Sequence, residues 1–421
     1  MGNRIFGLIV ITILLIIIDI YIYKAVRSVS WKWKDNNLLS FRYIWWGYSL
    51  LLIIGVFVGI FFNIKFIFRT IILVLFFMTF ISKIFILPFV IVDDIRRGIV
   101  WIKRKLFGSN RQLTQKSASS SDHIPRSEFI IKAGTLVAAL PLASFTYGMV
   151  SSAYDYRISQ KTLYLPNLPA SFDGIKLGQI SDIHSGSFYD RKAVIGGVDL
   201  LLKEKPDLIF FTGDLVNNFA TEMRNYQDIF SKVKAPLGVF SILGNHDYGD
   251  YHFGPGPSPA KAKNLESVKL SHKNMGWDLL LNESRRLKID NEEIGILGVE
   301  NWGEGRFAKY GRVDLAVKNT DDLPLKLLLS HDPSHWRAQI LPEYPQIDAM
   351  FSGHTHGMQF GIMTDKFQWS PAQYVYKEWA GHYQEKNQQL YVNVGYGFLG
   401  YPGRVGILPE ITIFELRRQP A

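Results

Sequence analysis

Residues 351–357 read FSGHTHG, which places two histidines one residue apart between glycines, directly after the mostly apolar run Ile347–Met350. Two histidines at this spacing can hold one metal ion, hold two, or lie in a turn without a ligand. On a strand or at its end, side chains two residues apart point the same way, with about 6.5 to 7 Å between their Cα atoms. That separation favours two neighbouring ions over one, so we expect His354 and His356 to bind different ions.

Four other short polar segments, SDIH, TGDL, GNHD and SHD, contain further ligand-type residues. Each is weak evidence alone. The Gly-Asp of TGDL, for example, is common in turns. Together with GHTHG they supply imidazole nitrogens and carboxylate or amide oxygens, which suit Zn, Mn or Fe better than Ca or Mg. The candidate ligands are too many for one ion and suit two ions that share a carboxylate: Asp182, His184, Asp214, Asn245, His331, His354 and His356.

Each polar segment follows a short apolar run of the length of a buried strand. Polar, helix-compatible stretches separate these runs, which favours an α/β architecture with ligands gathered at the carboxyl ends of the strands. A loop and then a helix are expected within residues 248–274. The expected strands are Lys176–Ile180, Leu208–Phe211, Val239–Leu243, Leu325–Leu329 and Ala349–Phe351.

In this order the segments match DxH, GD, GNH[DE], a lone His and GHxH, and the chain therefore resembles the calcineurin-like metallophosphoesterase superfamily over residues 165–416. It is similar to the membrane-anchored bacterial branch, which has hydrophobic helices before this domain and ends it in a PPEIT-like strand, here LPEITIFEL at 408–416. The resemblance implies a four-layer α-β-β-α sandwich. Met358 departs from the pattern, because that branch usually has Gly there, and this puts the fit of the substrate in doubt more than metal binding.

The resemblance also implies a site with two divalent metal ions, Mn, Zn or Fe, and a bridging hydroxide that attacks phosphorus. One ion would be held by Asp182, His184 and His356. The other would be held by Asn245, His331 and His354, and Asp214 would bridge the two.

Three further residues have expected roles near the substrate. His246 is left over from coordination and is expected to protonate the leaving oxygen, oriented by Asp247. Arg404, in YPGRVG, is a candidate contact to phosphate or pyrophosphate, since a guanidinium matches such oxygens bidentately. The alternative for Arg404 is a surface salt bridge. The irregular segments 248–274 and 300–307 are expected to flank the site and select the substrate, whereas His252, His272, His335 and His382 are expected to lie on the surface or in packing.

The first 150 residues differ from the rest in composition. They carry 18 Lys and Arg against 6 Asp and Glu, which leaves 29 against 31 for the remainder. The basic excess therefore belongs to the hydrophobic half, and a nucleic-acid partner, which needs a basic patch on the folded domain, is not expected. Cys is absent, which removes thiolate nucleophiles and ligands.

Three stretches qualify as transmembrane helices by length and composition, at about 5–23, 44–62 and 70–92 within a region 1–108. A fourth, at 129–150, is a further span or a cleaved, signal-like segment, and we favour a span. A polar linker is expected at 109–128, and the phosphoesterase domain at 151–421. Asp19 and Lys83 reach similar depths in the first and third spans, so we expect an ion pair between them.

Short loops with many Lys and Arg face the cytoplasm. The first and third loops are basic, with five and eight such residues, and the second has two. If the fourth stretch spans, the domain after it is extracytoplasmic; if it does not, the domain is cytoplasmic. The expected location is thus the bacterial cytoplasmic membrane, with an extracytoplasmic catalytic domain.

The sequence therefore predicts an integral membrane hydrolase that acts on phosphodiester or pyrophosphate bonds of lipid or cell-wall-related phosphates. One alternative is a metal-binding membrane scaffold or regulatory module without turnover. Another, a transporter with a regulatory soluble half, is disfavoured because only two charges lie in the spans. The oligomeric state is not predicted.

Overall fold

The computed structural model describes residues 2–28, 35–62, 66–107, 126–305, 307–364 and 366–418. The chain forms two compact units, Met1–Thr146 and Tyr147–Ala421. Most of the expected linker, residues 109–125, and the basic residues Lys32, Lys34 and Lys65 of the expected loops lie outside the described residues.

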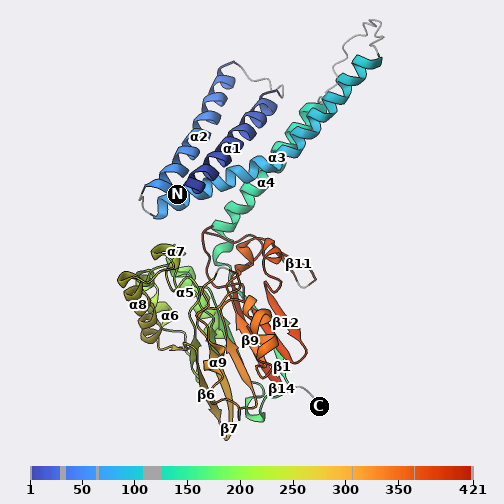
Figure 1. The fold of residues 1–421 in the computed structure, drawn as a ribbon. Coiled ribbons are helices and arrows are strands. Elements are labelled where there is room, and N and C mark those ends of the chain that lie inside the picture. The colour runs from blue at the N-terminus through green and yellow to red at the C-terminus, as the bar shows by residue number, and fades with distance from the viewer. Residues whose placement is uncertain are drawn as a thin grey trace. The chain divides into compact units, whose positions relative to one another are not determined.

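The apolar stretches form four helices that are long and apolar enough to cross a membrane. Such a stretch folds as a helix because it must satisfy all its backbone hydrogen bonds internally where water is absent. The four expected spans lie in these helices, apart from Phe62, which follows the second (Figure 1). The helices are α1 (Gly2–Ser28), α2 (Asp35–Phe61), α3 (Phe66–Phe107) and α4 (Arg126–Val150).

Helix α3 is longer than the sequence indicated. It does not end near Val92 but continues through the basic residues that we expected in a loop. Lys and Arg are good helix formers, and no proline follows Pro88 in this stretch to end the helix. At about 1.5 Å per residue its 42 residues extend about 63 Å, roughly twice the thickness of a hydrocarbon core. One end of α3 therefore reaches beyond the hydrocarbon.

The ion pair expected between the first and third helices is confirmed. Lys83 Nζ lies 2.9 Å from Asp19 Oδ1 and donates a hydrogen bond of 3.3 Å to Ser49 Oγ on α2. Asp19 is buried, with 4% of its surface exposed. A charge in this setting is costly without a partner. The ion pair therefore joins α3 to α1, and the hydrogen bond from Lys83 to Ser49 joins α3 to α2.

Two six-stranded sheets form the centre of the second unit (Figure 1). In the first sheet β2 to β5 are parallel, and β14 is antiparallel to β2 and parallel to β1. Its order is β1 (Arg157–Leu165), β14 (Glu410–Arg418), β2 (Lys176–Ile180), β3 (Leu208–Phe211), β4 (Val239–Ser241) and β5 (Asp278–Leu279).

In the second sheet four parallel strands lie between two antiparallel edge strands. Its order is β12 (Gly381–Glu385), β13 (Gln388–Val392), β9 (Ala349–Ser352), β8 (Lys326–Leu329), β7 (Glu292–Gly298) and β6 (Glu283–Ile289). A separate small hairpin pairs β10 (Ile362–Met363) with β11 (Gln368–Trp369).

Helices cover the outer faces of both sheets. The first sheet carries α5 (Arg191–Lys203), α6 (Gln227–Phe230) and α8 (Pro259–Met275), and the second carries α9 (Val313–Ala316), the π-helix η5 (Trp336–Ile340) and α10 (Leu341–Glu343). The short helix α7 (Asp250–Phe253) precedes α8. Further 3₁₀ turns are η1 (Ser152–Tyr154), η2 (Ala170–Phe172), η3 (Ser185–Ser187), η4 (Ala220–Asn225), η6 (His356–Gln359) and η7 (Pro371–Tyr374).

The alternation of side chains along the buried strands explains the layers. On β3, Ile209 and Phe211 pack under the helices, whereas Leu208 and Phe210 pack between the sheets. Successive residues of a strand face opposite sides, so an apolar strand of this kind needs a layer on each face. The result is the predicted four-layer α-β-β-α sandwich.

The strands expected to carry the ligand segments are confirmed as β2, β3, β4, β8 and β9. The first three are neighbours in one sheet and the last two in the other, so their carboxyl ends converge from both sheets. The approach is close at Gly353, where an added Cβ would lie about 2.0 Å from Ser181 Oγ and 2.2 Å from Asp182 Oδ2. Glycine at this position lets the loop after β9 reach the loop after β2.

Candidate metal centre

The candidate ligands form two groups of side chains at the converging strand ends. The first group is Asp182, His184 and His356, all buried. Its two imidazoles face each other, with 3.0 Å between His184 Nε2 and His356 Nε2. Asp182 Oδ1 lies 3.2 Å from His356 Nε2 and 4.0 Å from His184 Nε2.

The second group is Asp214, His331 and His354, with Asn245 beside them. Asp214 Oδ2 lies 3.2 Å from His331 Nε2. His354 Nδ1 lies 3.3 Å from His331 Nε2 and 2.9 Å from Asn245 Oδ1. Four potential ligand atoms therefore converge here, three from the imidazole and amide side chains and one from a carboxylate.

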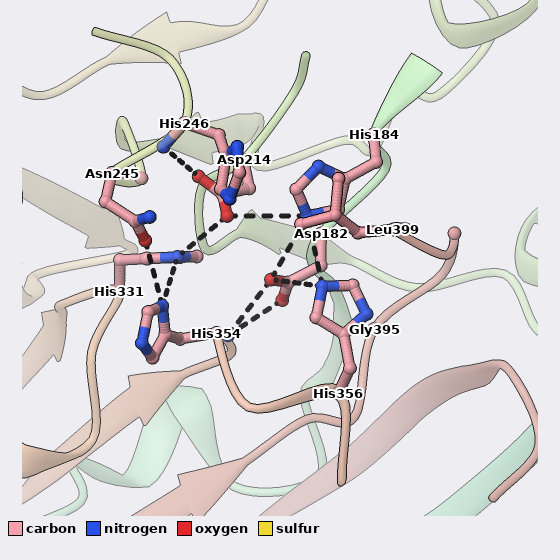
Figure 2. Close-up of polar contacts among 12 residues, drawn as sticks. Asp182, His184, Asp214, Asn245, His246, His331, His354, His356, Gly395 and Leu399 are labelled. Carbon is pink, nitrogen blue, oxygen red and sulfur yellow. Dashed lines mark hydrogen bonds and ion pairs between the residues drawn. The ribbon is translucent and has the colours of Figure 1, made fainter. Parts of the chain in front are cut away.

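Asp214 connects the two groups. Its Oδ2 atom is 3.4 Å from His184 Nε2 in the first group and 3.2 Å from His331 Nε2 in the second. Figure 2 shows this carboxylate between the two imidazoles, with dashed contacts to both. A carboxylate in this place is the one side chain of the centre that can serve both groups at once.

The second nitrogen of each of three imidazoles is held by a neighbouring group. His331 Nδ1 lies 2.7 Å from the Thr212 carbonyl oxygen, and His184 Nδ1 lies 3.1 Å from Asn217 Oδ1. Both oxygens accept hydrogen bonds, so in the neutral ring each Nδ1 carries the proton and each Nε2 offers a lone pair. His354 Nε2 lies 2.8 Å from the Tyr376 hydroxyl. Such outer contacts fix the orientation of metal-binding imidazoles.

This arrangement fits cations. The lone pair of His331 Nε2 faces a carboxylate oxygen of Asp214, and His184 Nε2 lies 3.0 Å from His356 Nε2. Opposed acceptors of this kind repel unless a proton or a metal ion lies between them. The donor set, imidazole nitrogens with carboxylate and amide oxygens, is one that Zn, Mn and Fe accept. The residues present therefore fit a divalent metal centre.

The pKa values of these groups follow from their charges and burial. Burial alone would raise the pKa of both aspartates, but His356 beside Asp182 and His331 beside Asp214 outweigh it and leave both pKa values below the usual range. Burial would lower the pKa of His331, but Asp214 prevails and raises it to about 10. In His184 burial dominates and lowers the pKa. The carboxylates thus attract positive charge, which His331 supplies as a proton.

Several of these residues have a left-handed backbone. The φ angles are 52° at Asp182, 47° at His184, 60° at Asp214, 75° at His354 and 49° at His356. Non-glycine residues rarely adopt this region, and such strain gathers at functional sites. The expectation that the two histidines of GHTHG follow strand geometry is wrong, because β9 ends at Ser352. A tight loop, not a strand, directs His354 and His356 to different groups.

Met358 continues this loop. Its φ angle is 49°, a left-handed conformation that glycine adopts without a steric penalty, and its side chain is 46% exposed. The loop therefore keeps a glycine-type turn although it carries a side chain, and that side chain points toward solvent instead of crowding the ligands.

His246 lies beside the centre but not in either group. Its ring packs edge-on against His184 and stacks on Tyr251, with ring centroids 5.0 and 4.4 Å away. Its backbone N–H donates to Asp214 Oδ1 at 2.8 Å, and its Nδ1 lies 2.8 Å from the Asn217 carbonyl oxygen. The residue is half-buried, at the edge of the centre.

The expectation that Asp247 orients His246 is wrong. The Asp247 carboxylate accepts hydrogen bonds from four backbone N–H groups, those of Asp214, Leu215, Val216 and Gly244. Burial raises the pKa of Asp247 to about 7, and the charge of Asp214 adds to this effect. The carboxylate is fully used in holding the loop after β3 against the loop after β4. It is therefore part of the framework that positions Asp214.

The expectation that Arg404 contacts phosphate is also wrong, and so is the alternative that it forms a surface salt bridge. This side chain has no exposed surface. Its guanidinium donates to the carbonyl oxygens of Val394, Gly395 and Gly397, at 2.8 Å for Val394 and 3.0 Å for Gly395, and lies 3.3 Å from His356 Nδ1. A guanidinium that is fully buried and bonded to backbone carbonyls does not face a substrate, so Arg404 supports the loop behind His356.

Sequence reasoning missed three residues that touch the centre or its loops. Asn217 contacts both His184 and His246, and Glu222 accepts from the N–H groups of Asn217, Asn218 and Phe219 and so shapes that loop. Tyr376 contacts His354. None of the three belongs to a ligand-type motif. The pair of asparagines directly after GDLV was the one signal that a turn rich in polar contacts follows Asp214.

The other histidines among the described residues lie outside the centre. His272 and His335 are buried, with Nδ1 3.0 Å from Ser241 Oγ and 2.8 Å from Ser330 Oγ. Trp302 stacks on His335 at 4.3 Å, and Trp336 is fully buried. His252 is exposed, and His382, on the edge strand β12, lies 2.8 Å from Gln389 on the neighbouring strand β13. All four histidines therefore have packing or surface roles.

Beside the second group lies a cavity of about 200 Å³. It begins at Asn245, whose Nδ2 donates to the Tyr251 hydroxyl at 3.0 Å. Phe307 lies between the cavity and the centre, with its ring 5.0 Å from that of His354. Aromatic residues dominate the wall, which includes Tyr248, Tyr251, Phe307 and Tyr310.

Comparison with known proteins assigns both halves of the chain. Residues 3–153 match the family described as "Probable Calcineurin-like phosphoesterase, transmembrane domain", and residues 175–358 match "Calcineurin-like phosphoesterase". An uncharacterized metallophosphoesterase of Bacillus subtilis, YkuE, is 30% identical over 292 residues, covering 68% of this chain and 94% of the relative.

Two further relatives are each about a quarter identical to this chain. A transmembrane protein with metallophosphoesterase domain from Danio rerio is 26% identical, over 73% of this chain and 67% of the relative. The UDP-2,3-diacylglucosamine pyrophosphatase LpxG of Chlamydia muridarum is also 26% identical, over 68% of this chain and 97% of the relative.

Proposed function

Because this chain belongs to the calcineurin-like metallophosphoesterase family and is an integral membrane hydrolase, we propose that it hydrolyses phosphodiester or pyrophosphate bonds at a centre of two divalent metal ions. The observation that carries the proposal is the position of Asp214, whose Oδ2 lies within 3.4 Å of an imidazole nitrogen in each group. One carboxylate shared by two nearby groups is the arrangement that two neighbouring ions require.

In this proposal one ion is held by Asp182, His184 and His356, the other by Asn245, His331 and His354, and both by Asp214. Such ions, when bound, would polarise the phosphoryl oxygens and would lower the pKa of a bound water molecule. The ions would be Mn, Zn or Fe, and the donor set alone does not choose among them.

The chain's own residues would orient the substrate and move one proton. His246 holds its Nδ1 proton against the Asn217 carbonyl, so Nε2 faces the leaving oxygen. In the imidazolium form Nε2 carries a second proton, which it would give to that oxygen. Positioned proton donors of this kind contribute about 100- to 10,000-fold in rate. The aromatic cavity beside Asn245 would receive the group attached to the phosphate, and its walls come from the two irregular segments, at Tyr251 and Phe307.

We further propose a lipid-linked or cell-wall-related phosphate as the substrate. Four apolar helices precede the catalytic domain, and the LpxG relatives are named as pyrophosphatases of a diacylated sugar nucleotide. By the distribution of basic loops the protein would lie in a bacterial cytoplasmic membrane with its catalytic domain outside. A metal-binding scaffold without turnover is the second candidate, disfavoured because no ligand of the motif is missing.

A hydrolysis assay tests this proposal. Full-length protein in detergent micelles, supplied with Mn or Zn, is given an aromatic phosphodiester, a diphosphate diester or a phosphomonoester. We expect metal-dependent hydrolysis of one or both of the first two. Phe307→Ala should raise KM for the aromatic diester about tenfold, which corresponds to about 1.4 kcal/mol of lost contact, whereas Tyr164→Ala, on the exposed part of β1, should not. Absence of hydrolysis with either metal supports the scaffold.

A further inference from the structure

The end of the fourth apolar helix is fastened to the catalytic domain. Residues 147–150 belong to the same compact unit as that domain. The N–H of Arg404 donates to the Gly148 carbonyl at 3.2 Å, and the Tyr189 hydroxyl donates to the Met149 carbonyl. An added Cβ at Gly148 would lie about 2.5 Å from the Tyr401 hydroxyl oxygen. The last turn of α4 is thus seated closely on the loop at residues 401–404.

The segment of residues 358–375 adjoins that same loop. Gln359 Nε2 donates to the carbonyl oxygens of Tyr401 and Gly403, at 2.8 and 2.9 Å. The backbone pairs as well, because Val405 N–H donates to the Gln359 carbonyl at 2.8 Å and Gly361 N–H donates to the Val405 carbonyl at 2.9 Å. Both this segment and the end of α4 therefore form hydrogen bonds with the loop at residues 401–405.

Large apolar side chains stand exposed along this segment. We call them the apolar face: Met358 is 46% exposed, Ile362 50%, Phe367 56%, Tyr374 76% and Val375 65%. The sequence of residues 358–377 contains three charged residues, Asp365, Lys366 and Lys377, and both lysines are exposed. Soluble proteins seldom gather exposed apolar side chains in this way without a partner.

We infer that the apolar face inserts into the surface of the lipid bilayer that α4 crosses. The candidate span Ser127–Val150 ends at the loop that the face adjoins, so the boundary of the hydrocarbon passes beside it. Tyrosines belong at such a boundary, and Tyr147 and Tyr189 are exposed there together with Tyr374. The two lysines suit the anionic head groups of the membrane surface. Apolar side chains of this kind bury about 5 to 10 Å into the interface.

Two residues of this face neighbour, along the chain, residues that belong to or contact the metal centre. Tyr376 follows Val375 and contacts His354, and Met358 follows the loop that carries His356. Docking would therefore present the centre to a phosphate held at the level of the lipid head groups. This consequence for the substrate rests on the proposed function, whereas the docking itself does not.

The chain contains no cysteine, so a single introduced cysteine gives a unique label in the full-length protein. The test uses Ile362→Cys and Val375→Cys, each carrying an environment-sensitive fluorophore, in vesicles of phosphatidylcholine and phosphatidylglycerol with nitroxide-bearing lipids. The matched control is Lys288→Cys on β6, whose end lies far from β11 within the domain (Figure 1). Circular dichroism checks that each variant is folded, and Phe367→Cys replaces either one that is not.

We expect both labels on the apolar face to lose roughly half or more of their fluorescence to the lipid nitroxides, as interfacial side chains do, and the Lys288→Cys label to lose little. Quenching no greater than that of the control, in folded protein, would overturn the inference. Another outcome is that the labels quench one another as the protein density rises, without quenching by the lipid nitroxides. That result would assign the face to a second copy of the chain and would also overturn the inference. None of these outcomes depends on whether the protein has turnover.

Discussion

The Nδ1 atom of His246 lies 2.8 Å from the carbonyl oxygen of Asn217. A carbonyl oxygen only accepts hydrogen bonds, so the ring keeps its proton on Nδ1 in the neutral form. The side chain of Asn217 holds His184 at the same time, at 3.1 Å. One asparagine therefore sets the orientation of a candidate ligand through its side chain and of the candidate proton donor through its backbone.

The first prediction concerns His246. Changing His246→Gln should lower kcat by about 100- to 10,000-fold on a diester with a poor leaving group, and much less with a good one that departs without a proton. Metal content should stay that of the unchanged protein, because His246 belongs to neither ligand group. Loss of the metals, or full activity on the poor leaving group, would show that the assignment is wrong.

The second prediction concerns Arg404. Changing Arg404→Ala leaves several buried carbonyl oxygens without donors, each at a cost of about 1 to 3 kcal/mol, so the melting temperature should fall steeply. In the fraction that folds, KM for a small diester should change little, because the guanidinium faces backbone and not substrate. Arg417→Ala, at the exposed end of β14, is the matched control. A large rise in KM at unchanged melting temperature would restore the phosphate contact.

The third prediction concerns the buried pair in the membrane unit. Lys83→Ala leaves the Asp19 carboxylate buried without its cation, and breaking a buried pair costs about 3 to 5 kcal/mol. We expect the single variants Asp19→Lys and Lys83→Asp to express poorly and to melt early in detergent, and the double exchange to recover both properties. If the double exchange did no better than either single change, the pair would not contribute to stability.

The fourth prediction concerns acid stability. Burial lowers the pKa of His272 to about 3, against about 6.5 in the unfolded chain. The unfolded state then binds the proton first, so the free energy of unfolding is fully present above pH 6.5 and falls as the pH drops toward 3. At pH 5 the protonation of this single group in the unfolded state lowers the free energy of unfolding by about 2 kcal/mol.

His272→Leu should therefore lose less stability than the unchanged protein between pH 7 and pH 5, measured as melting temperature. His252→Leu serves as the control, because that ring is exposed. Parallel losses in the two variants would mean that the buried ring does not carry this sensitivity.

The sequence was sufficient for features that depend on local pattern. Short apolar runs followed by polar segments identified the strands, and apolar length identified the four helices. The depth of Asp19 and Lys83 along their helices was enough to predict their pairing, because a helix advances by a constant rise per residue.

Features that depend on contacts between distant loops could not be predicted. Asp247 and Arg404 have residue types that suit catalysis, but their partners are backbone groups from other loops, which a linear pattern does not reveal. The left-handed backbone at His354 and His356 was missed for the same reason, since strand periodicity does not extend into a loop that the opposite sheet constrains. Helix α3 continues past its expected end because charged residues limit the part of a helix that can lie in the hydrocarbon, whereas they do not end the helix itself.

The most direct measurement joins metal content to turnover in the full-length protein and its Asp214→Asn variant, each purified with Mn or Zn. We predict about two ions per chain and metal-dependent hydrolysis of a phosphodiester for the unchanged protein. For Asp214→Asn we predict fewer ions and hydrolysis reduced by more than about 100-fold, beyond what the loss of an outer contact to a ligand would cause. If the Asp214→Asn variant kept both ions and its turnover, or if the folded, metal-loaded protein hydrolysed no phosphodiester or diphosphate, the proposed two-metal centre would be contradicted.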